Sequence, residues 1–129
     1  MTVDEKVWKL AQLLHDKTGS GKIKWDRSPS KNSFLTAFPN YSVQISEGWG
    51  IQGVQLSPLV ASAVPKHYSI SIFNEDGGLV EQAGDPTIKA NVNGASPDPN
   101  ALMAELYSMA RRSAVGADAA LDELIAELS

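Results

Sequence analysis

The sequence predicts an α+β fold: an N-terminal helix, an antiparallel β-meander of four to six strands, and two C-terminal helices hinged at Gly116 that pack on one sheet face. Apolar residues recur with helical spacing at both ends of the chain, whereas apolar and polar residues alternate in the middle. The alternating segments follow one another through short turns with no helical crossover, which is typical of a meander. The length of 129 residues suits a single domain spanning residues 1–129.

The first helix is marked by the Thr-x-x-Glu spacing of Thr2 and Glu5, which is that of a capping box. Lys17 complements the helix dipole in the last turn, and Gly19 is well placed to end the helix. One apolar face is expected, made by Val3, Val7, Leu10, Ala11 and Leu14, with Trp8 beside it.

The middle of the chain alternates with the period of β-strands. A hairpin turn is expected at residues 74–78, where Gly77 and Gly78 supply positive φ. One face of the sheet is expected to be polar and wet. Strands are predicted at residues 22–25, 33–38, 41–46, 67–73 and 79–83, with one more short strand at 87–92.

The C-terminal part begins with Asp98 and Pro99, a cap followed by a proline at the first helical position. Arg111 and Arg112 close this helix, and they have two interpretations: they neutralise the helix end and pair with the acidic last helix, which is favoured, or they grip a phosphate or an acidic partner. After Gly116 a final helix is expected, and the residues at its polar positions are all acidic. This helix is expected to bury one apolar stripe, made by Leu121, Leu124, Ile125 and Leu128.

Residues 48–65 carry no charge and depart from this plan. The favoured interpretation is a strand at 51–56 followed by a connection folded over the core, because apolar segments are usually buried. The alternative is an exposed apolar segment that meets another chain, with Trp49, Leu56 and Leu59 as contact residues.

Composition excludes several kinds of chemistry. The chain has no cysteine, its two histidines (His15 and His67) lie in different predicted elements, and no Gly-x-Ser-x-Gly motif occurs. We therefore expect no enzyme, no metal site and no cofactor. The net charge of −4 argues against nucleic acid as a partner. No membrane helix and no signal peptide is recognisable, so we expect a cytoplasmic protein without membrane contact.

Aromatic and charged residues beside the sheet can be interpreted in two ways. Trp25, Arg27, Trp49 and His67 can line a small pocket with a stacking surface and a cationic contact. The favoured alternative is that Trp25 packs on the sheet edge and that Asp26 and Arg27 form a surface ion pair.

Several segments together resemble a group of small bacterial or phage proteins of unknown function. They are Trp25, the strands at 41–45 and 68–73, Asp76-Gly77, the ending at 106–118 and the acidic leucine-rich helix. The resemblance implies a fold and a bacterial or phage origin, and it implies no activity.

The function expected from these observations is that of a non-enzymatic interaction protein. It would associate with itself or with another protein through residues 48–65 or through a sheet edge. The alternative is a domain that binds a nucleotide or another small metabolite through the aromatic and arginine residues beside the sheet.

Overall fold

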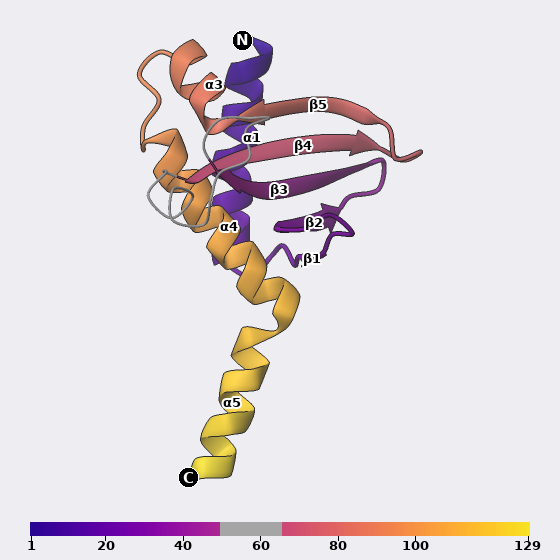
Figure 1. Ribbon diagram of the computed structural model, residues 1–129, viewed down its shortest axis with the longest axis vertical. Helices are drawn as coiled ribbons and strands as arrows, with labels where there is room; N and C mark the ends of the chain where they lie inside the picture. Colours follow the sequence, from indigo (N-terminus) through magenta and orange to yellow (C-terminus); the bar gives the residue numbers. More distant parts are fainter. Residues whose placement is uncertain (50–65) are drawn as a thin grey trace.

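The computed structural model of the protein describes residues 1–49 and 66–129, and it confirms the predicted α+β fold. Helices α1, α3 and α4 lie against a five-stranded sheet, and α5 projects away from this body (Figure 1). The elements are α1 (Val3–Gly19), β1 (Asp26–Arg27), β2 (Ser33–Ala37), β3 (Tyr41–Trp49), β4 (Lys66–Asn74), β5 (Leu79–Gly84), α3 (Asp85–Asn91), α4 (Pro99–Val115) and α5 (Ala117–Leu128).

The sheet is an antiparallel meander with the strand order β1-β2-β3-β4-β5. Phe34, Ile45, Ile70 and Ala83 pair in one row across β2 to β5, and all four are buried. Helix α4 packs against this side of β1 to β4, and α1 packs against α4. The next row of paired residues points to the opposite side of the sheet and is small and polar, as the alternation predicts. It contains Ser33, Ser46 and Ser69.

The caps predicted from sequence are present. The Thr2 hydroxyl accepts from the Glu5 amide at 3.1 Å, while the Glu5 carboxylate accepts from the Thr2 amide at 3.2 Å. In the hairpin turn, the Asn74 side-chain oxygen accepts from the amide of Gly78 at 2.8 Å. Gly77 has the predicted positive φ, at 83°, but the same prediction for Gly78 is wrong. Val3 departs from the prediction, because its side chain is exposed rather than part of the buried face of α1.

The strand predicted at residues 22–25 does not form. Backbone groups of this segment form hydrogen bonds with side chains instead of with a neighbouring strand. The Trp25 amide donates to Ser113 Oγ at 2.9 Å, and the Lys24 carbonyl accepts from Thr36 Oγ1 at 2.9 Å. The strand begins only at Asp26, and β1 is two residues long.

The strand predicted at residues 87–92 is also wrong, since α3 occupies this segment. Pro86 lies in the first turn of the helix, where its missing N–H has no intrahelical partner to lose, and Asp85 is favoured beside the positive end of the helix dipole. Ile88, whose alternation with its neighbours suggested a strand, is fully buried from α3.

The two C-terminal helices are hinged at Gly116, as predicted. Gly116 adopts the left-handed conformation, with φ of 67° and ψ of 39°, and it is both the C-cap of α4 and the N-cap of α5. The predicted burial of the apolar stripe of α5 is wrong, because α5 contains no buried residue. The exposed fractions are 57% for Leu121 and Leu124, 62% for Ile125 and 86% for Leu128.

None of the helices in the described ranges is long and apolar enough to cross a membrane.

Candidate functional site

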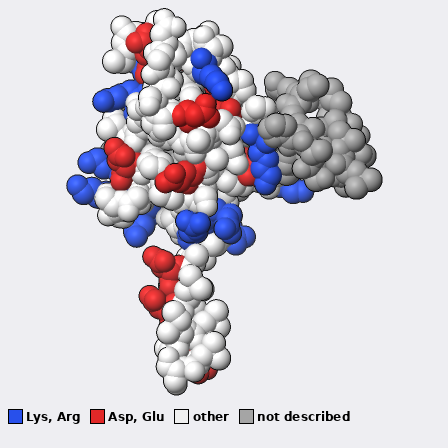
Figure 2. All heavy atoms as spheres, turned by 90° about the vertical axis from the view of Figure 1, so that its left-hand side faces the viewer, with Lys and Arg blue, Asp and Glu red and all other residues white. Residues whose placement is uncertain are grey.

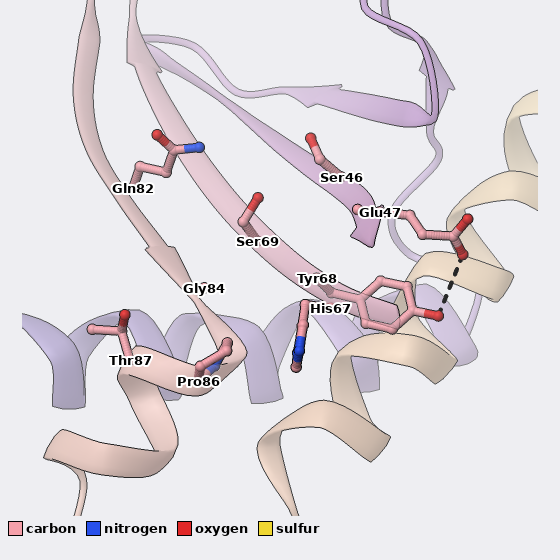
Figure 3. A pocket seen from close by; sticks show the side chains of 10 residues that line it. Ser46, Glu47, His67, Tyr68, Ser69, Gln82, Gly84, Pro86 and Thr87 are labelled. Atoms are coloured by element: carbon pink, nitrogen blue, oxygen red, sulfur yellow. Dashed lines mark hydrogen bonds between the residues drawn. The ribbon is translucent and has the colours of Figure 1, made fainter. Parts of the chain in front are cut away.

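A hollow of about 450 Å³ lies where β3, β4 and β5 meet α3. Figure 3 shows Ser46, Ser69 and Gln82 projecting from one side of the sheet, with Thr87 on α3 and His67 at the floor. Ser46 and Ser69 are directly paired across β3 and β4, and Gly84 pairs with Ser69 on the next strand. Small side chains on three neighbouring strands leave this hollow open to solvent.

His67 is oriented by a buried carboxylate. Its Nδ1 lies 3.3 Å from Asp85 Oδ2, and the Asp85 side chain is 5% exposed. Asp85 Oδ1 accepts from the Tyr68 amide at 2.7 Å, and Asp85 Oδ2 also accepts from Asn100 Nδ2 at 3.0 Å. The same Asn100 amide donates to the Lys66 carbonyl at 2.9 Å. Asp85 thus joins β4, α3 and α4 at one point.

A carboxylate bonded to a histidine, as in this arrangement, is the orienting half of a hydrolytic triad. A carboxylate at Nδ1 favours a histidine with Nε2 free to accept a proton. Within residues 1–49 and 66–129, no serine or threonine hydroxyl is hydrogen-bonded to His67. The described residues also contain no group of three His, Asp or Glu side chains able to hold a metal ion. The contacts of Asp85 with His67, Tyr68 and Asn100 tie β4, α3 and α4 together.

A second polar cluster lies on the helix-covered side of the sheet. The Tyr68 hydroxyl donates to Glu47 Oε2 at 3.3 Å, as the dashed line in Figure 3 shows, and Lys66 Nζ lies 3.7 Å from the same oxygen. Burial and the nearby Glu47 carboxylate raise the pKa of Tyr68 to about 12. Burial likewise raises the pKa of Tyr107, against the opposing effect of Arg111. Both phenols are thus held in the neutral form.

The structure separates Trp25 and Arg27 from His67, with which the sequence grouped them in one pocket. Trp25 is 2% exposed, and its indole N–H donates to Thr18 Oγ1 at 2.9 Å, so it is a core residue. Arg27 lies on the edge strand β1, whereas His67 lies in the hollow near β5. Trp49 is the last residue of β3, and the predicted contact residues Leu56 and Leu59 fall outside the described residues.

Sequence reasoning missed Asp85 and Asn100, which complete the contacts of His67. For Asp85 the sequence does offer a signal, because the order Gly84-Asp85-Pro86 is typical of a helix start. Asn100 contacts Asp85 across 15 positions of sequence, and no periodicity reveals such a contact.

The largest departure from the sequence expectation is the surface of α5. Its four apolar side chains form an exposed stripe at positions i, i+3, i+4 and i+7 of a helix whose main packing partner among the described elements is α4. A second hollow of about 500 Å³ lies at the elbow between α4 and α5. Its lining combines apolar, basic and acidic side chains with glycines: Ile23, Lys24, Met109, Arg112, Gly116 and Asp118 are among them.

Comparison of the chain with protein-family models, with curated proteins and with solved structures finds no match.

Proposed function

We propose that this is a non-enzymatic interaction protein that pairs with a second copy of itself through α5. The observation that carries the proposal is the apolar stripe of Leu121, Leu124, Ile125 and Leu128, which α5 exposes to solvent away from the body (Figure 1). Exposed apolar surface of this kind on a folded protein is typical of an interface. The sequence favoured residues 48–65 or a sheet edge, and among the described residues the stronger support is for α5.

Charge is divided between α5 and the body. Four of the 15 acidic residues lie in α5, and all 11 Lys and Arg precede residue 113. The remaining 11 acidic residues balance the basic ones, so the net charge of −4 resides in α5. Figure 2 shows Lys and Arg side chains gathered on the body next to the point where α5 leaves it. An acidic helix and a basic body end attract each other when they come from different copies.

The antiparallel arrangement of two α5 helices brings these charges together. A helix of 12 residues is about 18 Å long, so the tip of one α5 would reach the elbow of the other. Glu127 would then lie beside Lys24 and Arg112 of the second copy, and Leu128 beside the hollow at the elbow. A parallel pair would instead bring the two basic body ends together and leave Glu127 far from any cation.

The area that a stable interface must bury also favours contact between α5 of one copy and the body of the other. Four side chains on one short helix bury well under the roughly 1,200 Å² that specific interfaces need. The hollow at the elbow, with Ile23 and Met109 in its lining, supplies further apolar surface in the antiparallel arrangement.

Sedimentation velocity of the full chain across the micromolar range tests the proposal. We expect a monomer–dimer equilibrium that Glu127→Lys and Arg112→Glu each weaken and that their combination partly restores. Glu75→Lys, in the β4–β5 turn, makes the same charge change away from α5 and is the matched control. A strict monomer at every concentration, or a dimer that none of these variants affects, would overturn the proposal.

A cytoplasmic location and a bacterial or phage origin belong to the same proposal. The location is supported by the absence of cysteine, which suits a reducing compartment. The origin is supported by the sequence segments that resemble the bacterial group.

A further inference from the structure

We infer that a second site, formed by Arg27 and Arg111, binds a phosphomonoester of a planar ring, the chemistry of a mononucleotide. The site is a hollow of about 360 Å³ between the loop after β1 and α4. It lies on a different face of α4 from the elbow hollow, because Arg111 lines the first and Arg112 the second. Its lining includes Arg27, Ser28, Asn32, Phe34, Tyr107 and Arg111.

The cationic part of the site comes from two distant segments. Arg27 pairs with Phe34 in β1 and β2, which directs its side chain to the helix-covered side of the sheet. Arg111 is one turn after Tyr107 on α4, so the two lie on one helix face. Over the described ranges, neither guanidinium has a carboxylate oxygen within 4.0 Å. Two unpaired guanidiniums at one hollow are suited to a phosphate, which they can bind through parallel N–H groups.

The loop beside them is braced before any ligand arrives. Ser28 Oγ donates to Gln44 Oε1 at 2.9 Å and accepts from the Ser30 amide at 3.2 Å. Ser33 Oγ donates to the Ser30 carbonyl at 2.9 Å. Asn32 holds a left-handed φ of 55°, and its carbonyl accepts from the Glu47 amide at 3.0 Å. A loop fixed in this way loses little conformational freedom on binding.

The remaining wall is aromatic. The rings of Phe34 and Tyr107 lie 5.3 Å apart at 53°, and Tyr107 is only partly buried. A planar ring can pack on the exposed part of Tyr107 while its phosphate lies between Arg27 and Arg111. The hollow is within the size range of small-ligand sites. The charge and the ring together favour a mononucleotide over inorganic phosphate.

Isothermal titration of the full chain with AMP, adenosine and inorganic phosphate tests the inference. We expect AMP to bind at least about tenfold more tightly than either fragment, and Arg27→Ala or Arg111→Ala to weaken AMP binding by about tenfold each. Arg27→Lys should restore only part of the loss, because an ammonium lacks the planar fork. Lys31→Ala removes a neighbouring loop charge that does not line the hollow, and it should leave binding unchanged.

Three outcomes would overturn this site: no heat of binding with AMP at millimolar concentration, equal affinity for AMP and phosphate, or unchanged AMP affinity in the Arg27→Ala/Arg111→Ala double variant. Unchanged melting temperatures would show that these exposed substitutions leave the fold intact. The same titration with Leu124→Ala separates this site from the proposed dimer, because AMP affinity should not depend on α5.

Discussion

Leu124→Ala gives the most direct measure of what α5 contributes to association. Leu124 is one of the two central residues of the apolar stripe and is 57% exposed in its own chain. In an antiparallel pair related by twofold symmetry, Leu124 lies close to its own copy in the partner. The substitution therefore removes the contribution of two leucine side chains from the association free energy of each dimer.

The magnitude follows from the exposed fraction. Complete burial of a leucine side chain is worth about 1.5–3 kcal/mol, and 57% of Leu124 remains to be buried, so each copy contributes about 0.9–1.7 kcal/mol. Two copies give about 1.7–3.4 kcal/mol, which corresponds to a Kd raised about 20- to 300-fold. Because alanine favours helix, the substitution does not weaken α5 itself.

The assay is the dimer dissociation constant from sedimentation equilibrium, with the far-ultraviolet circular dichroism of each variant as a check on helix content. Ala126→Ser is the matched control, since residue 126 lies off the apolar stripe on the same helix. A Kd that stays within a factor of two of wild type for Leu124→Ala would refute the reasoning that the stripe is the contact surface.

Three further predictions concern the body. Asp85→Ala should lower the free energy of unfolding by about 1–3 kcal/mol in urea denaturation, because the buried Tyr68 amide loses its acceptor; a loss under half of this would contradict it. Thr2→Ala should cost about 1 kcal/mol through loss of the capping box, while the exposed Thr87→Ala serves as control. The raised pKa of Tyr68 contributes stability that is present below pH 10.0 and lost as the pH rises through about 12, so Tyr68→Phe should flatten the alkaline limb of the stability profile; an unchanged limb would contradict the shift.

Local signals were sufficient to predict the parts of the fold that local contacts stabilise. The Thr2–Glu5 box spans three positions, and the bonds of Asn74 in the hairpin turn span no more than four. Alternation in β3 was likewise sufficient to identify its apolar face, because Val43 and Ile45 are buried whereas Ser42, Gln44 and Ser46 are only partly buried. In β4 the alternation is less clean, because Ser71 is buried and Ile72 is only partly buried.

The errors arose where a distant contact decided the outcome. Residues 22–25 can alternate like a strand, yet Ser113, 88 positions away, bonds the Trp25 amide instead. The stripe of α5 predicts an amphipathic helix correctly, but periodicity cannot tell whether the covering surface belongs to the same chain. That Arg27 and Arg111 line one hollow depends on the packing of α4 against β1 and β2, which no sequence motif specifies.

The placement of all the net charge in α5 has a consequence for the behaviour of the body in solution. A cut at the Gly116 elbow would leave residues 1–116 with equal numbers of acidic and basic residues. Such a fragment would be near its isoelectric point at neutral pH, where electrophoretic mobility vanishes and mutual repulsion no longer opposes precipitation. The helix that exposes the apolar stripe is thus also the part of the molecule whose charge opposes precipitation.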